Sequence, residues 1–205
     1  MKKRPRRTTI SRTNLSRRGV PKRFHDLTVD DLKDFGVETR KPIIKFVKNY
    51  INNLDEKFYK GEGILLYGSN GTGKSTIASV LVKQAYICRY TSRRVTFVDY
   101  IERYTKAWNC KDYDEKVSLQ RELIEQYKGI EFLVLEEIGK ELDTKLAVTV
   151  LEDLLRYRED CGLPTIICTN MTPQNIKEKY GASIWSLLKG NVNSLKLVGE
   201  DRRVD

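Results

Sequence analysis

The sequence predicts an α/β fold, a three-layer sandwich in which helices cover both faces of a central parallel sheet. Short runs that are apolar throughout, such as Gly63–Tyr67 and Phe132–Leu135, alternate with longer segments of helical periodicity. A glycine-rich turn joins the first run to a helix. With 205 residues, 40% of them hydrophobic, the chain is long enough to bury a sizeable core around one such sheet.

The chain divides into a basic arm and a core. We expect residues 1–18 to be disordered alone, because they have little apolar surface to bury and repel one another. Residues 19–205 form the predicted core, with a helical lead-in over 19–62 and the sheet within 63–205. Apolar residues at helical spacing predict a helix over Pro42–Phe58 in the lead-in.

Strands and helices then alternate along the core. We expect strands at Gly63–Tyr67, Val95–Val98, Phe132–Leu135, Pro164–Thr169 and Ser194–Val198. We expect the intervening helices at Lys74–Arg89, Tyr100–Lys128, Thr144–Asp160, Pro173–Tyr180 and Ala182–Leu188. The long segment after the second strand has an irregular patch at Asn109–Asp112, where its helix should be interrupted.

The net charge of +10 is confined to the N-terminus. Residues 1–25 hold ten Lys or Arg and no acid, whereas the other 180 residues hold 28 basic and 28 acidic residues. A basic segment of this kind neutralises phosphates and releases their counterions, which favours a nucleic acid as its partner. The alternatives are a solubilising tail or a dock for an acidic protein.

A phosphate-binding loop follows the first strand. Residues 68–75, Gly-Ser-Asn-Gly-Thr-Gly-Lys-Ser, match the pattern G-x-x-x-x-G-K-[ST] at every position. Glycines let successive N–H groups point at phosphate oxygens, Lys74 reaches the β- and γ-phosphates, and the Ser75 hydroxyl binds Mg²⁺. We expect nucleotide contacts from Gly68, Ser69, Asn70, Gly71, Thr72, Gly73, Lys74, Ser75 and Thr76.

Polar side chains end two further strands. Glu136 and Glu137 come directly after the apolar run Phe132–Leu135, and Asn170 follows Pro164–Thr169. Ligands of open α/β folds bind at this carboxyl edge of the sheet. One carboxylate can hold Mg²⁺ while the other polarises the attacking water, and an amide there can orient that water.

The order of these signals resembles the AAA+ ATPases among the P-loop NTPases. The run Phe-Leu-Val-Leu-Glu-Glu-Ile-Gly at 132–139 is similar to the acidic motif of the DnaC/IstB group. Gly-Val-Pro-Lys-Arg-Phe at 19–24 looks like the lead-in of that group, and Thr-Asn-Met at 169–171 resembles its sensor-1 strand end. The resemblance covers roughly residues 19–205, and a short C-terminal lid remnant would complete the fold.

The resemblance implies a DNA-replication ATPase with ATP and Mg²⁺ as cofactors. DnaC-type proteins load the hexameric replicative helicase onto single-stranded DNA. The bound nucleotide controls when the loader binds and when it releases. The resemblance also implies that loader molecules associate with one another on the helicase. The resemblance places Lys74 and Ser75 at the nucleotide and Mg²⁺, Glu136 at the Mg²⁺-coordinating position, Glu137 at the catalytic base and Asn170 at sensor 1. A compact loader of this kind would suit a phage or a mobile element.

The family contacts single-stranded DNA where this chain has Tyr100–Trp108. Arg103, Tyr104, Lys106 and Trp108 offer the positive charge and stacking surface that such binding needs. The alternative is that Tyr104 and Trp108, four residues apart, simply pack on a core helix.

The sequence departs from the family pattern in the acidic motif and the arginine finger. Glu136 stands where the family usually has Asp. Residues 183–189, where the family places its finger, contain no arginine, and Lys189 lacks the planar guanidinium fork. ATP hydrolysis is therefore expected to be slow, or the finger comes from Arg156, from Arg158 or from a partner.

The remaining departures concern the two ends of the chain. The resemblance assigns the sensor-2 arginine to Arg202 or Arg203, where the sequence follows the family pattern only loosely. Family loaders often carry a folded helicase-binding domain ahead of the ATPase, and here only the basic arm stands in that position.

Other functions remain open at this point. They are an IstB-type transposition helper, a nucleotide-gated binding module that hydrolyses little ATP, and a small-molecule kinase for which no lid is evident.

Neither a membrane span nor a secretory signal is evident, so we expect a cytoplasmic protein without a membrane partner. One histidine and four cysteines without a C-x-x-C pair argue against a zinc site.

Overall fold

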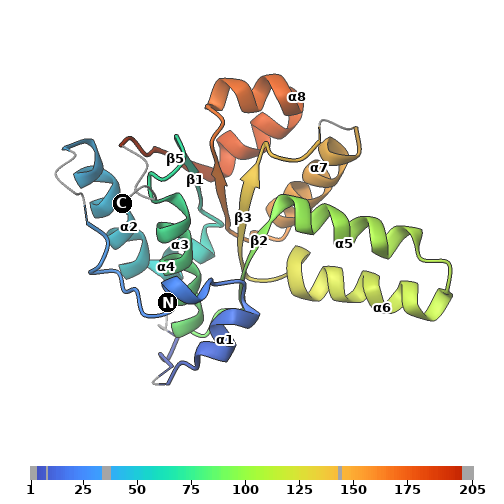
Figure 1. The fold of residues 1–205 in the computed structure, drawn as a ribbon, viewed down its shortest axis with the longest axis horizontal. Coiled ribbons are helices and arrows are strands. Elements are labelled where there is room, and N and C mark those ends of the chain that lie inside the picture. The colour runs from blue at the N-terminus through green and yellow to red at the C-terminus, as the bar shows by residue number, and fades with distance from the viewer. Residues whose placement is uncertain (1–3, 8, 34–37, 143–144, 200–205) are drawn as a thin grey trace.

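The computed structural model describes residues 4–7, 9–33, 38–142 and 145–199. Its centre is a five-stranded parallel sheet in the order β2-β3-β4-β1-β5, which confirms the predicted α/β class (Figure 1). The strands are β1 (Gly63–Tyr67), β2 (Ser92–Thr96), β3 (Phe132–Ile138), β4 (Thr165–Thr169) and β5 (Val192–Lys196). The α-helices are α1 (Arg12–Arg17), α2 (Lys41–Asn52), α3 (Leu54–Tyr59), α4 (Lys74–Ile87), α5 (Phe97–Asn109), α6 (Tyr113–Leu123), α7 (Lys145–Asp160) and α8 (Pro173–Asn191). Shorter turns are η1 (Lys22–Phe24), η2 (Glu38–Arg40) and the π-helical η3 (Ile124–Lys128).

Two hydrophobic cores lie on opposite faces of the sheet. Successive side chains of a strand point to opposite faces, so Ile64 and Leu66 of β1 join the core beneath α2 and α4. Leu65, between them, joins the core beneath α5, α7 and α8. Both faces of the central strands are therefore covered, which is why the sequence of these strands is apolar throughout.

The second strand begins and ends earlier than the sequence predicts. β2 pairs with β3 from Ser92 opposite Phe132 to Thr96 opposite Glu136. The hydroxyl of Thr96 accepts a hydrogen bond of 3.1 Å from the N–H of Asp99 and so caps α5. Phe97, predicted as strand, is therefore the first residue of the helix.

The last strand also begins earlier than predicted. β5 pairs with β1 from Val192 opposite Gly63 to Lys196 opposite Tyr67. The two helices predicted before it form α8, which is interrupted at Gly181 with φ of 88°. The chain after β5 is described only to Gly199, so the predicted lid remnant lies outside the described residues.

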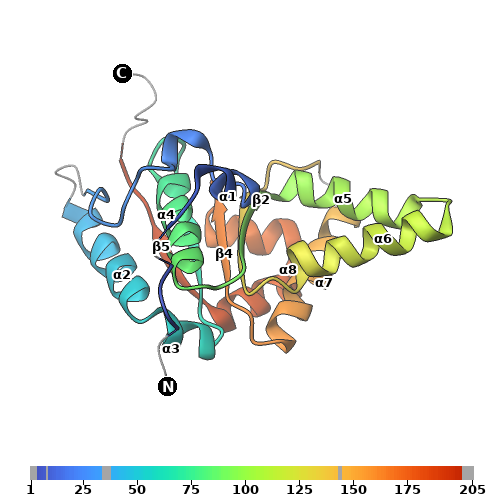
Figure 2. The same cartoon turned by 90° about the horizontal axis from the view of Figure 1, so that it is seen from below.

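The long helical segment predicted after the second strand forms a hairpin. α5 and α6 lie side by side and project away from the sheet in both views (Figures 1 and 2). The predicted irregular patch at Asn109–Asp112 forms the turn between them, and Asp112 caps α6 through a 2.8 Å bond from the N–H of Glu115. Among the described residues, no helix has the length and apolarity needed to cross a membrane.

The sequence predicts a disordered arm over residues 1–18, whereas the described part of this segment packs on the core (Figure 2). Leu15 of α1 is 2% exposed within the same core as α4. The guanidinium groups of Arg7 and Arg18 lie 4.4 and 3.7 Å from the centre of the Tyr86 ring on α4. The charge pattern alone missed this packing, because one leucine and two stacked arginines provide the contacts.

Candidate nucleotide-binding site

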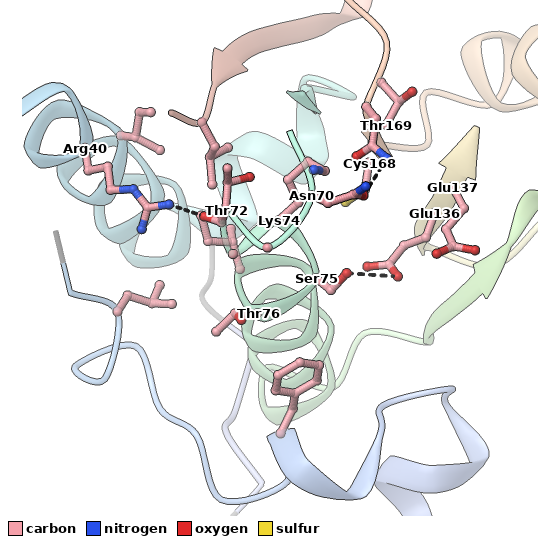
Figure 3. Close-up of a pocket in the computed structure, with 18 of the residues that line it drawn as sticks. Arg40, Asn70, Thr72, Lys74, Ser75, Thr76, Glu136, Glu137, Cys168 and Thr169 are labelled. Atoms are coloured by element: carbon pink, nitrogen blue, oxygen red, sulfur yellow. Dashed lines mark hydrogen bonds between the residues drawn. The ribbon is translucent and has the colours of Figure 1, made fainter. Parts of the chain in front are cut away.

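A cavity of about 420 Å³ opens where the carboxyl ends of β1, β3 and β4 meet the start of α4 (Figure 3). One wall is polar and consists of residues 70–76 together with the ends of β3 and β4. The lead-in contributes apolar side chains, Phe24, Leu32, Ile43 and Ile44, and charged ones, Arg23, Asp31, Lys33 and Arg40. A pocket of this size that combines apolar side chains with polar groups suits a nucleotide.

The phosphate-binding loop is already shaped for an anion. Gly71 and Gly73 adopt φ of 70° and 94°, values that L side chains rarely take. The Thr72 hydroxyl donates a 2.9 Å bond to the Ser69 carbonyl and fixes the turn. The Lys74 ammonium donates to the carbonyls of Gly68 and Ser69 at 2.8 and 2.6 Å, so it lies over the loop.

Ser75 and Glu136 meet beside the start of α4 in a way that fits a divalent cation. The Ser75 hydroxyl lies 3.4 Å from Oε2 of Glu136 (Figure 3). Glu136 is 2% exposed, and its Oε1 has no hydrogen-bond partner among the described residues. A buried carboxylate oxygen without a partner is costly, and Mg²⁺ prefers such oxygen ligands.

Glu137 and Asn170 line the same cavity from β3 and the end of β4. Glu137 has φ of 61°, and the β3–β4 register shifts at this residue, between Glu136 and Ile138. Its Oε1 accepts a 2.6 Å bond from the Lys140 ammonium. Asn170 donates from Nδ2 to Oδ1 of Asn70 at 2.8 Å, which places its amide over the phosphate-binding loop.

This arrangement matches solved structures over most of the chain. The crystal structure of the DnaC helicase loader has a TM-score of 0.74, with 17% identity over 87% of this chain and 100% of that one. The structure of DnaI has a TM-score of 0.65, with 18% identity over 91% of this chain and 99% of that one. The chain therefore shares the fold of these two structures. No protein-family model matches the sequence, and a search of curated proteins finds no match.

A replication initiator also shares this fold. The initiator DnaA, solved with AMPPCP and single-stranded DNA, has a TM-score of 0.68, with 16% identity over 88% of this chain and 51% of that one. Because all these identities are below 25%, the comparisons concern the fold, and the functional roles rest on the residues of this chain.

Two arginines that the sequence reasoning missed contact residues of this site. Arg40 is 4% exposed and donates from Nε to the Val198 carbonyl at 2.9 Å and from Nη2 to the Thr72 carbonyl (Figure 3). Arg94 of β2 forms an ion pair with Glu136. Arg94 lies just outside the strand that the sequence predicts at Val95–Val98 and only the structure places it within β2, and nothing in the sequence marks Arg40.

Arg158, an alternative source of the finger in the sequence analysis, is excluded by its burial in the core. It is 1% exposed, and burial lowers the pKa of its guanidinium below the ordinary value. Its donors bond the carbonyls of Ile130 and Pro164, both at 2.7 Å, at the start of β3 and β4 and so at the end of the sheet opposite the cavity. Arg158 therefore stabilises the fold and cannot reach a nucleotide.

The remaining predicted site residues lie apart from the cavity or outside the described residues. Arg156 is exposed on α7 and bonds Glu152 and Ser183. Arg103, Tyr104, Lys106 and Trp108 all lie on the projecting helix α5. The sensor-2 candidates Arg202 and Arg203 fall outside the described residues.

Proposed function

We propose that this chain is an ATP-dependent helicase loader of DNA replication that acts in the cytoplasm. It binds ATP with Mg²⁺, single-stranded DNA and a hexameric replicative helicase, and nucleotide state controls release. The observation that carries the proposal is the convergence of Lys74, Ser75, Glu136, Glu137 and Asn170 on one cavity. This convergence occurs in a chain that covers the whole of a solved helicase loader.

The cavity orients ATP in one direction. The phosphates lie against the N–H groups of the phosphate-binding loop and the start of α4, whose helix dipole favours negative charge. Lys74 turns from the Gly68 and Ser69 carbonyls towards the β- and γ-phosphates. The adenine base lies against apolar side chains of the lead-in, near Phe24 and Ile44.

Ser75 and Glu136 hold Mg²⁺, which neutralises phosphate charge when bound. Glu137 activates the attacking water, for which it must leave Lys140, and Asn170 orients that water. Residues 183–189 supply no arginine and Arg158 is buried at the far end of the sheet. We therefore expect slow turnover by the isolated chain, because a missing finger costs on the order of 10³-fold or more in rate.

The same observations favour a second candidate, a nucleotide-gated binding module with little hydrolysis. In this reading, the Glu137–Lys140 ion pair persists with ATP bound. An IstB-type transposition helper would use the same cavity with a transposase as partner. The partner protein distinguishes the loader from the transposition helper, and the extent of ATP hydrolysis distinguishes the binding module from both.

The test is a pull-down from the source cells with the full chain, performed with ATP, with ADP and without nucleotide. Recovery of the replicative helicase in amounts that depend on nucleotide supports the loader. The Lys74→Ala variant is the control, and it should lose both nucleotide binding and the dependence on nucleotide. Recovery of a transposase would instead support the transposition helper, and recovery of no protein partner would contradict the loader.

A further inference from the structure

Arg94 connects Glu136 with the N-terminal segment, by which we mean residues 4–19 as far as the structure describes them. Its Nη2 donates to Oε2 of Glu136, the same oxygen that Ser75 approaches. Its Nη1 donates to the Gly19 carbonyl at 2.9 Å, and its main-chain N–H donates to the Arg18 carbonyl at 2.8 Å. The side chains of Arg94 and Glu136 are 14% and 3% exposed, so this ion pair is largely shielded from water.

The contact with the N-terminal segment is close. A Cβ atom on Gly19 would lie 2.0 Å from the Arg94 carbonyl oxygen, and Gly19 has φ of 74°. Glycine is therefore required where the chain passes over β2. This close approach holds the Gly19 carbonyl beside the Arg94 guanidinium, so Arg94 retains an acceptor if it releases Glu136.

Arg94 and a divalent cation make opposing demands on one carboxylate. A buried carboxylate is stabilised by a guanidinium partner. A metal ion between Ser75 and Glu136 would face that guanidinium across the same carboxylate, and the two cations would repel each other in a poorly screened environment. By reciprocity, whatever weakens the Arg94–Glu136 pair strengthens metal binding, and metal binding weakens the pair.

We propose that Arg94 is an internal counter-cation of Glu136 that competes with Mg²⁺ for this carboxylate. Arg94 is thus a positioning residue that sets the Mg²⁺ concentration at which the site is loaded. When it releases Glu136 it stays on the Gly19 carbonyl. The inference rests on the proposed nucleotide and Mg²⁺ site.

The test compares two substitutions in the same strand of the full chain. Arg94→Gln keeps a hydrogen-bond donor and removes the charge beside Glu136. Arg93→Gln removes the same charge from the neighbouring residue, whose guanidinium instead contacts Gln126 and Tyr127 of η3. The affinity for AMPPCP is measured by calorimetry in EDTA and at rising concentrations of free Mg²⁺, after circular dichroism has verified folding.

We expect Arg94→Gln to reach half of its Mg²⁺-dependent gain in affinity at a Mg²⁺ concentration at least about tenfold lower than the parent. Arg93→Gln should match the parent. Equal midpoints for the two variants, or a higher midpoint for Arg94→Gln, would overturn the inference while leaving nucleotide binding intact. Absence of AMPPCP binding to the parent under every condition would overturn the proposed function as well.

A measurement on the unsubstituted chain covers the case in which Arg94→Gln fails to fold. The side-chain N–H resonances of Arg94 and Arg93 are followed by NMR as Mg²⁺ is added to the AMPPCP-bound protein. The Arg94 resonance should shift while that of Arg93 stays in place. An unmoved Arg94 resonance would show that the guanidinium keeps Glu136 in the metal-loaded state and would contradict the competition.

Discussion

Glu136 and Glu137 are adjacent carboxylates with different surroundings. Glu136 is buried and paired with Arg94, whereas Glu137 is exposed and paired with Lys140. The difference arises at a register shift between β3 and β4, where Glu137 takes φ of 61° and leaves the ladder. Left-handed backbone at a non-glycine residue is costly and concentrates at functional sites. Both carboxylates line the cavity, but Glu136 is buried there and Glu137 is exposed.

Glu137→Gln should retain nucleotide and lose hydrolysis. The amide keeps the shape of the side chain but cannot accept a proton, so we expect phosphate release to fall about 10²-fold or more. Phosphate release and the nucleotide retained after gel filtration measure the two effects. Lys140→Ala is the matched control, because it removes the ion pair while leaving the carboxylate, and it should not slow turnover. Unchanged turnover in Glu137→Gln would show that another residue activates the water.

The α5–α6 hairpin presents cations and aromatic rings away from the nucleotide cavity. Arg103 and Lys106 of α5 each lie 3.8 Å from a glutamate of α6, Glu122 and Glu115. These are long, exposed ion pairs, which contribute little to the stability of the fold and leave both cations available to phosphates. Trp108 is 46% exposed and meets the Tyr104 ring edge-on at 5.4 Å. The two rings contact each other, and much of the Trp108 surface is still open.

Trp108→Ala should weaken binding of single-stranded DNA about 5- to 100-fold, the effect expected for loss of one stacked base. Fluorescence anisotropy with a labelled oligonucleotide, at two salt concentrations, measures it. Tyr113→Ala removes an aromatic side chain that is 77% exposed at the start of α6 and serves as the control. If both variants bind equally well, the DNA path lies elsewhere on the molecule.

At the scale of the whole molecule, the N-terminal segment joins three parts of the fold. It covers the edge strand β2 through the bond from Arg94 to the Arg18 carbonyl, and it covers α4 through Leu15. Arg4 lies 4.0 Å from the centre of the Tyr90 ring and pairs with Glu131, just before β3. The segment therefore carries both the excess positive charge of the chain and a share of its packing.

Removal of residues 1–18 should lower both stability and nucleic-acid affinity. Burial of a leucine contributes about 1.5–3 kcal/mol, so thermal unfolding should shift downwards by several degrees. The salt dependence of nucleic-acid binding should flatten, because fewer counterions are released. Binding assays across salt concentrations and calorimetric unfolding measure these effects.

Arg6→Gln with Arg17→Gln separates charge from packing in this segment. Both side chains are exposed, so the double variant should flatten the salt dependence while leaving the unfolding temperature unchanged. Unaltered nucleic-acid binding after both the deletion and this substitution would show that the segment stabilises the fold and does not bind nucleic acid.

Patterns along the sequence predict those parts of the protein that depend on neighbours in the chain. Strand and helix periodicity predicted the parallel sheet, and the spacing from Gly68 to Ser75 predicted the loop that lines the cavity. The boundaries of β2 differ from the predicted ones, because pairing with β3 and the Thr96 cap decide them.

Which distant charges meet depends on the folded arrangement of the chain. Arg94 and Glu136 are 42 residues apart, and Arg40 and Thr72 are 32 apart. No local pattern specifies such pairs, since many arginines in a basic chain are candidates for each carboxylate or carbonyl. The same holds for the N-terminal segment, whose charge predicts disorder while the fit of Leu15 and Gly19 against α4 and β2 orders it. Selection among these partners depends on the packed geometry, because burial makes one ion pair strong and leaves exposed alternatives weak.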